Sequence, residues 1–220
     1  MFKKIRYYFW ASYRRRLLDK LQNKYSFLYK GIVLDIGGRD RGMFKKPKDK
    51  VEKWIFADIE SKHNPDIILD VADMNMFLNN SIDYISAMEL FEHVEKIEKG
   101  LEECYRVLKN DGIMLMSVPF LYPIHADPYD FQRWTIYKWR DILKEKGFII
   151  ETEEIMGNFL FVFSEYCKIF IKTLPKILKW PAYLFLPILD FLVYLDNFNF
   201  IKENNKLNKF NGGYFLIVKK

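Results

Sequence analysis

Residues 119–135 contain most of the side chains that can do acid–base chemistry or stack against a ring. His125 is the first candidate for a general base, because an ordinary imidazole titrates near pH ~6.5 and can accept a proton at neutral pH. Asp127 or Asp130 can assist or replace it. Tyr122, Tyr129, Arg133 and Trp134 are candidates for binding a sugar or lining an apolar pocket. The alternative is a local role, in which His125 holds the loop and Asp130 pairs with Arg133.

A second group of polar residues follows short apolar runs that are typical of buried strands. Two glycines, Gly37 and Gly38, follow the first run, and carboxylates lie at the ends of four of the first five runs. Glycines let a backbone approach a ligand closely, and a carboxylate after the second strand can accept both hydroxyls of a ribose. The order of these residues along the chain predicts a site for a nucleoside-shaped ligand.

The elements that must position these residues alternate between strands and helices. Strands are expected at residues 32–36, 54–59, 66–69, 84–88, 113–118 and 148–155. Helix-like stretches lie between them, the clearest at 94–108 and 135–146, and residues 110–112 predict a turn. This alternation favours a doubly wound α/β sheet, in which ligands bind beyond the carboxyl ends of the strands.

Four segments in this order resemble the class I S-adenosylmethionine-dependent methyltransferases, in particular a type 11-like bacterial subgroup. The segments are VLDIGG at 33–38, FADIE at 56–60, DYISAMELFEHV at 83–94 and ECYRVLKNDGIMLMSVP at 103–119. The resemblance covers about residues 31–157. It implies a Rossmann-like, seven-stranded sheet whose last strand is antiparallel, and residues 214–219 are placed to form that strand.

The resemblance also implies S-adenosylmethionine as the cofactor. The backbone at Gly37 and Gly38 would contact its amino-acid portion, with Asp35 supporting the loop. Asp58, with Ile59 beside it, would hold the ribose hydroxyls.

Further along, the resemblance implies that Asp70 and the backbone of Val71 face the adenine, and that Met88 and Glu89 line the methionine end. Gly37 in a tight turn and Asp70 as a helix cap are the structural alternatives. The family usually has glycine where this chain has Arg39. Arg39 also replaces the middle glycine of the nicotinamide fingerprint, which disfavours a nicotinamide-dependent enzyme.

Residues 119–135 are similar to a stretch in bacterial methyltransferases associated with surface-polysaccharide or other glycan biosynthesis. The resemblance therefore implies O-methylation of a glycan or glycolipid precursor by in-line methyl transfer. Two alternatives stay open. One is a methyltransferase acting on a lipophilic small molecule such as a quinone, and the other is a non-catalytic, membrane-apposed scaffold whose cofactor site has degenerated at Arg39.

The 220 residues predict one main domain, at 31–157 and 213–220, with two additions. Residues 1–30 hold nine lysines and arginines but only one acidic residue, Asp19. The net positive charge of this segment therefore exceeds the +6 of the whole chain. Its apolar spacing predicts a basic amphipathic helix, which either lies on an anionic membrane or packs on its own domain. Nucleic acid is not expected as a partner, because no other basic face continues the patch.

Residues 158–212 form an apolar, helical insertion before the last strand. Its most apolar part, residues 180–195, is interrupted by Asp190 and two prolines and is shorter than the ~20 residues of a membrane-spanning helix. We expect it to lie on a membrane surface, with a lid or a homodimer surface as the alternative.

The two cysteines and three scattered histidines lack the spacing of a structural zinc site, so no metal is expected. The chain shows no signal-peptide pattern. These features predict a cytoplasmic protein, peripheral on the inner face of the cell membrane if the basic and apolar segments bind lipid.

Overall fold

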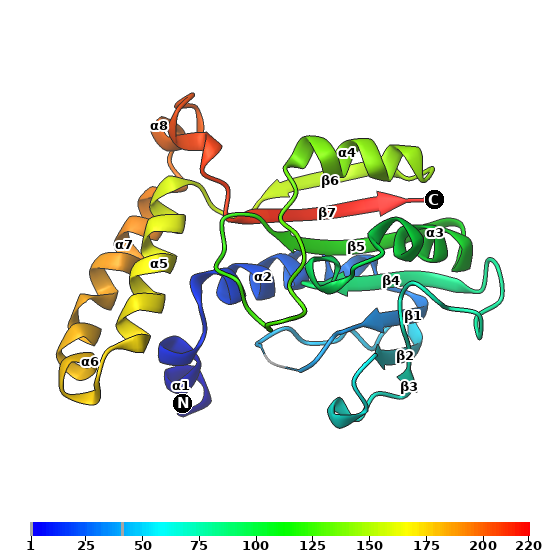
Figure 1. The fold of residues 1–220 in the computed structure, drawn as a ribbon, viewed down its shortest axis with the longest axis horizontal. Coiled ribbons are helices and arrows are strands. Elements are labelled where there is room, and N and C mark those ends of the chain that lie inside the picture. Colours follow the sequence, from blue (N-terminus) through cyan, green and yellow to red (C-terminus); the bar gives the residue numbers. More distant parts are fainter. Residues whose placement is uncertain (1, 41) are drawn as a thin grey trace.

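The computed structural model describes residues 2–40 and 42–220, and its centre is a seven-stranded sheet (Figure 1). The strands are β1 (Gly31–Ile36), β2 (Val51–Asp58), β3 (Ile67–Ile68), β4 (Ile82–Met88), β5 (Leu108–Pro119), β6 (Ile149–Ile155) and β7 (Gly213–Lys219). Their order is β3-β2-β1-β4-β5-β7-β6. Strand β7 is antiparallel to both of its neighbours and the other pairs are parallel, which confirms the predicted sheet.

Helices flank the sheet and extend beyond one end of it (Figure 1). They are α1 (Phe2–Trp10), α2 (Tyr13–Lys24), α3 (Ile97–Val107), α4 (Ile136–Glu145), α5 (Phe159–Thr173), α6 (Lys176–Ala182), α7 (Leu186–Leu195) and α8 (Asn199–Lys202). Short 3₁₀ turns include η1 (Ser26–Leu28), η2 (Ser61–His63), η3 (Phe91–His93), η4 (Tyr183–Phe185) and η5 (Leu207–Lys209).

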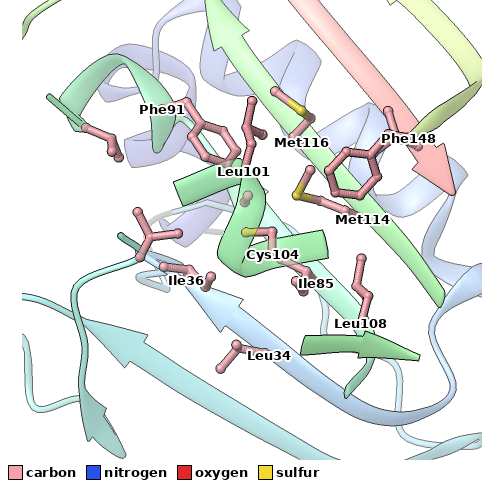
Figure 2. Packing of buried hydrophobic residues seen from close by; sticks show 14 of the residues in the cluster. Leu34, Ile36, Ile85, Phe91, Leu101, Cys104, Leu108, Met114, Met116 and Phe148 are labelled. Atoms are coloured by element: carbon pink, nitrogen blue, oxygen red, sulfur yellow. The ribbon is translucent and has the colours of Figure 1, made fainter. Parts of the chain in front are cut away.

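The central strands β1, β4 and β5 bury both of their faces, because successive side chains point to opposite sides of the sheet. Leu34 belongs to the cluster under α3 and α4, shown in Figure 2, whereas the adjacent Val33 packs in the cluster under α2. Tyr84 and Ile85 divide in the same way. Burial on two sides explains why the strands read as continuous apolar runs rather than alternating ones.

The expected alternation of strand and helix fails in the first half of the sheet. Among the described residues, the connection from β1 to β2 contains no helix, and β2 to β4 contains only the 3₁₀ turn η2 and the short strand β3. Helix α2, which precedes β1, covers this face instead through Leu18 and Leu21. The first connection is rich in lysine and interrupted by Pro47, so it lacks the apolar stripe of a packed helix.

Two local predictions are corrected. The turn expected at residues 110–112 lies within β5, where the pairing with β4 shifts register and Asp111 has a φ of 62°. The single helix expected in residues 1–30 is two helices, because the Ser12 hydroxyl accepts a hydrogen bond of 3.0 Å from the Arg15 backbone N–H and begins α2.

The insertion forms α5 to α8 and stands beside the sheet rather than on it, next to α1 (Figure 1). Phe161 and Ile171 of α5 pack with Leu186 and Leu189 of α7 in a cluster that also contains Tyr13. Phe9 of α1 packs against Tyr183, with ring centroids 5.1 Å apart. Helices α1, α5 and α7 are therefore neighbours, although residues 1–30 and 158–212 are far apart in the sequence.

The helical stretch Lys176–Leu195 contains twenty residues and has a mean hydropathy of 1.4 over its most apolar window. Within the described residues it is the one stretch long and apolar enough to cross a membrane by length and composition. The prolines do not break it as expected: Pro181 lies near the end of α6, and Pro187 lies in the first turn of α7, where proline is well tolerated.

Candidate cofactor and acceptor site

The glycine loop begins at the carboxyl end of β1. Gly37 has a φ of +72°, which a residue with a side chain rarely adopts. A Cβ on Gly38 would lie 2.0 Å from the Asp35 carboxylate, so this position also requires glycine. The Trp54 indole N–H donates to Asp35 at 2.9 Å, and the Lys46 ammonium lies 3.6 Å away. Burial nevertheless raises the pKa of Asp35 to about 6.

Helix α2 holds the far end of the same loop. A carboxylate oxygen of Asp19 accepts a hydrogen bond of 2.6 Å from the Met43 backbone N–H. A Cβ on Gly42 would collide with this carboxylate at 2.2 Å. The N-terminal segment therefore shapes the loop, a role that its basic composition did not indicate.

Asp58 ends β2 and is buried, as a ribose-binding carboxylate would be. One of its oxygens accepts from the Glu60 backbone N–H at 2.9 Å, and the other lies 3.0 Å from Nδ1 of His63. Arg39 contacts the opposite nitrogen of His63 at 2.8 Å. His63 and Arg39 therefore cover Asp58, and the side chain of Ile59 is exposed.

A cavity of about 350 Å³ adjoins this point of the sheet edge. Its lining consists of Gly38, Arg39, Asp40, Lys46, Phe56, His63 and Asn64. The glycine loop and the two residues that cover Asp58, Arg39 and His63, thus line the same cavity. Arg39, the departure from the family pattern, forms part of its wall.

Asp70 and Val71 follow β3. The Asp70 side chain is exposed and accepts a hydrogen bond of 2.8 Å from the Ala72 backbone N–H, so it stabilises its own turn. Val71 is buried against Gly100 of α3 and offers a ligand only its backbone.

Glu89 follows Met88 at the end of β4 and has a φ of 53°. Arg14 of α2 donates two hydrogen bonds to its carboxylate, each 2.6 Å long, and the Ser117 hydroxyl donates a third at 2.8 Å. Although burial acts to raise the pKa of Glu89, the Arg14 guanidinium lowers it below its usual value. Met88 is buried beside this pair of charges.

The loop that carries His125 is fastened to η3. The Gln132 amide donates to the carbonyls of Phe91 and Val94 at 3.0 and 2.6 Å, and the Phe131 backbone N–H donates to the Glu92 carbonyl at 2.9 Å. These bonds bring His125 beside Glu92 and His93, which directly follow the Glu89 turn in sequence.

Asp130 serves this loop by orienting its neighbours. Arg133 donates to both Asp130 oxygens, and the His125 backbone N–H donates to one of them at 2.9 Å. Burial acts to raise the pKa of Asp130, but Arg133 lowers it overall. Asp127 is exposed and joined to Pro128 by a cis peptide bond.

The expected acceptor-binding side chains separate into two sets. Tyr122 lies near His125, with ring centroids 5.3 Å apart. The Arg14 guanidinium lies over the Tyr122 ring, 5.8 Å from its centre. Arg133 is held by Asp130, Tyr129 is exposed, and Trp134 packs against Trp139 of α4. The structure thus places Tyr122 and His125 together beside the Arg14–Glu89 pair.

Comparison with known proteins adds a domain assignment to this geometry. Residues 44–116 match the family model described as a methyltransferase domain. This segment, about a third of the chain, therefore resembles a methyltransferase domain. No curated protein sequence matches the chain.

Solved structures are similar to this chain in fold. A S-adenosylmethionine-dependent methyltransferase from Archaeoglobus fulgidus superposes with a TM-score of 0.58 and 16% identity over 100% of both chains. The O-methyltransferase of a Brevibacillus brevis trans-AT polyketide synthase, in complex with S-adenosyl-L-homocysteine, superposes with a TM-score of 0.56 and 15% identity. The match covers 93% of this chain and 71% of that one. The [4+2]-cyclase SpnF superposes with a TM-score of 0.60 and 16% identity, over 92% of this chain and 80% of that one. The protein has the fold of the S-adenosylmethionine-dependent methyltransferases.

The residues at this edge of the sheet fit S-adenosylmethionine. The backbone at Gly37 and Gly38 has no side chain in the way, and Asp58 presents a buried carboxylate at the end of β2. A cofactor with a ribose diol needs such an acceptor, and the Glu89 carboxylate suits the cationic methionine end. The fit requires His63 to release Asp58.

Several residues of the site were not anticipated from the sequence. Arg14, Ser117 and Gln132 hold the carboxylate and the loop, and each comes from an element distant in sequence. Glu92 lies within the family-like segment 83–94 and was not among the expected site residues. It is 1% exposed, and neither of its carboxylate oxygens is hydrogen-bonded among the described residues. Burial and the nearby charge of Glu89 raise the pKa of Glu92 well above its usual value.

Proposed function

We propose that the methyltransferase domain transfers a methyl group from S-adenosylmethionine to a hydroxyl oxygen of a glycan or glycolipid precursor. The observation that carries this proposal is the position of His125: beside Tyr122, on a loop fastened next to the Glu89 end of the cofactor site. The fold alone does not fix the reaction, because a [4+2]-cyclase shares it.

The chemistry required of the chain is alignment and proton removal. The cofactor supplies a methyl group on a positively charged sulfur, which already activates it for in-line displacement. The Arg14–Glu89 pair keeps a carboxylate ionised at the methionine end, and Tyr122 offers a ring face against which a sugar can stack. His125 then accepts the proton of the attacking hydroxyl, since an imidazole does so at neutral pH.

Calorimetric titration of the purified chain with S-adenosylmethionine and S-adenosylhomocysteine tests the cofactor step. Micromolar binding that Asp58→Ala abolishes supports the proposal, and Asp73→Ala, beyond the same sheet edge, is the matched control. A folded protein that binds neither compound would favour the non-catalytic scaffold, with Arg39 closing the site.

Product analysis then identifies the acceptor class. Purified protein and labelled cofactor are incubated with polysaccharide precursors or with lipid extracts, and a mass increase of one methyl group is sought. His125→Ala should lower kcat by about 10²-fold or more, the usual contribution of a general base. Asp127→Ala should leave kcat unchanged if Asp127 takes no part.

A lipophilic acceptor such as a quinone is the second candidate, and one observation favours it. A cavity of about 360 Å³ lies between the loop after β5 and the insertion, lined by Leu121, Phe159, Val162, Phe163, Tyr166 and Phe210. An apolar cavity of this kind suits a ring or a prenyl chain. Methyl transfer only to an organic-soluble, sugar-free product would replace the glycan assignment with this one.

We also propose that the protein acts on the inner face of the cell membrane. Exposed apolar side chains cover α6, η4 and α7, among them Ile177, Trp180, Leu184 and Phe191. Exposed basic residues of α1, which packs against η4, lie beside this surface. Asp190 of α7 is paired with Arg16 at 2.8 Å and bonded to the Tyr8 hydroxyl, which favours a surface position over a membrane-spanning one. A homodimer contact or a lid over the site would be the alternative use of this surface.

A further inference from the structure

Glu92, His93 and His125 form a cluster whose three ligand-type atoms lie within 4.8 Å of one another. Nε2 of His93 is 3.8 Å from Oε1 of Glu92, and Nε2 of His125 is 3.9 Å from the same oxygen. Both distances are too long for hydrogen bonds. Glu92 is therefore a buried carboxyl group with no hydrogen-bonding partner among the described residues.

Such a group is costly to bury, because its transfer from water is not repaid by a hydrogen bond or an ion pair. Two arginines act on its charge, but Arg14 is committed to Glu89 and the Gly212 carbonyl, and Arg133 is committed to Asp130. A buried carboxyl without a partner, facing two imidazole nitrogens, is an arrangement that a ligand would complete.

The two histidines are already oriented to bind such a ligand. Nδ1 of His93 lies 2.5 Å from the Tyr129 carbonyl oxygen, so this nitrogen donates and leaves Nε2 with a free lone pair toward Glu92. Nδ1 of His125 lies 3.3 Å from the Pro123 carbonyl and 3.3 Å from an Asp130 oxygen, and its Nε2 also faces Glu92. Metal-binding histidines typically have their second nitrogen hydrogen-bonded to a carbonyl or carboxylate in this way.

We propose that Glu92, His93 and His125 bind a divalent first-row transition-metal ion. Two imidazoles and one carboxylate form a common ligand set for zinc, manganese or iron(II), with the remaining positions open to water or substrate. Ligand atoms around a tetrahedral ion at ~2.1 Å are about 3.4 Å apart. The observed separations of 3.8 and 3.9 Å need only a small closure to reach this geometry.

The sequence led us to expect no metal. Glu92 and His93 are adjacent, and His125 comes from another loop, which is not the ligand spacing of a structural zinc site. The bonds from Gln132 and Phe131 to η3, together with the contact of His93 with the Tyr129 carbonyl, bring the two histidines together, with ring centroids 4.9 Å apart.

The catalytic role of this site rests on the proposed methyl transfer to a hydroxyl, but it replaces His125 as the group that accepts the proton. A metal ion there lies beside the Glu89 end of the cofactor site and lowers the pKa of a coordinated acceptor hydroxyl. His125 then acts as a ligand, and the hydroxyl loses its proton to solvent or to a metal-bound hydroxide instead of to an imidazole.

Metal binding can be measured without the cofactor or an acceptor. The full chain, without a histidine tag, is treated with a chelator, dialysed and titrated with Co²⁺ by visible absorption and with Zn²⁺ and Mn²⁺ by calorimetry. One equivalent should bind and raise the Tm, because an ion that binds only the folded state stabilises it. Failure of all three ions to bind the folded protein would overturn the proposal.

Three variants locate the ion. Glu92→Gln, His93→Ala and His125→Ala should each weaken binding more than tenfold and remove the rise in Tm, whereas His63→Asn, at the remaining histidine, should bind as the wild type does. Glu92→Gln keeps the size of the side chain, so it should fold without metal. Binding that survives all three substitutions would place the ion elsewhere and contradict the proposal.

The outcome is separable from that of the proposed function. Metal binding without S-adenosylmethionine binding would support the metal site and refute the methyltransferase activity. Cofactor binding without metal binding would refute the metal site, support the methyltransferase proposal and leave His125 as the general base.

Discussion

Arg14 and Glu89 form a buried, two-pronged ion pair that joins the N-terminal segment to the carboxyl edge of the sheet. Their side chains are 4% and 16% exposed, and both hydrogen bonds are 2.6 Å long. The pair belongs to the candidate site as much as to the fold, because Glu89 directly follows β4 at the proposed position of the cofactor. It also explains why the basic segment is not free to act only as a membrane anchor.

Breaking this pair should destabilise the protein strongly. Arg14→Met leaves Glu89 as an uncompensated buried charge, and we expect a loss of about 3–5 kcal/mol in the free energy of unfolding by urea. Arg14→Met combined with Glu89→Gln should recover part of that loss. Arg140→Met, which removes an exposed pair with Glu153, should cost less than about 1 kcal/mol. Equal effects of the two arginine substitutions would contradict this account.

Removing the cover from Asp58 should strengthen cofactor binding. His63 occupies one oxygen of that carboxylate, and a hydrogen bond to a charged group contributes about 1.5–3 kcal/mol. His63→Ala should therefore lower the Kd for S-adenosylmethionine about tenfold in calorimetry. Lys62→Ala, whose side chain pairs with Glu60, is the neighbouring control. Weaker binding by His63→Ala would mean that His63 itself contacts the cofactor.

Asp35 should make stability fall as the pH rises. Because its pKa is raised from 3.8 to about 6 in the folded state, the folded protein holds this proton more tightly than the unfolded chain does. The resulting stability is complete below the unfolded pKa and is lost as the pH rises through about 6. Relative to Asp35→Asn, the wild type should lose about 3 kcal/mol between about pH 4 and pH 7, as measured by urea unfolding. A constant difference would show that Lys46 and Trp54 keep Asp35 ionised without cost.

Membrane binding should depend on the exposed face of the insertion. Leu184→Glu, at a side chain 80% exposed, should weaken co-sedimentation with phosphatidylglycerol vesicles about tenfold or more, because burying a leucine contributes about 1.5–3 kcal/mol. Leu78→Glu is the matched control, since Leu78 is 79% exposed on another part of the molecule. Added salt should weaken vesicle binding by the wild-type protein, because it screens the charges of the basic residues. Equal binding by both variants would exclude this surface as the contact.

The strand ends were predictable because each strand has a local signature. Buried parallel strands read as apolar runs, and the residue after each run is fixed to the same edge of the sheet. The sequence thus placed Gly37, Asp58 and Glu89 along one edge. It failed between β1 and β2, where a helix from before β1 covers the sheet, since an amphipathic stripe does not specify which surface it will cover.

By itself, the sequence determined the order of the strands along the chain and the carboxylates at the sheet edge, because these follow from hydrophobic runs, turn residues and local spacing. The antiparallel last strand was expected from the family resemblance. Only the tertiary structure decided what those carboxylates contact. Arg14 reaches Glu89 across 75 residues and His125 reaches Glu92 from another loop. Such pairings depend on how α2 and residues 119–135 pack against the sheet, and packing is a property of the whole fold that no local pattern encodes.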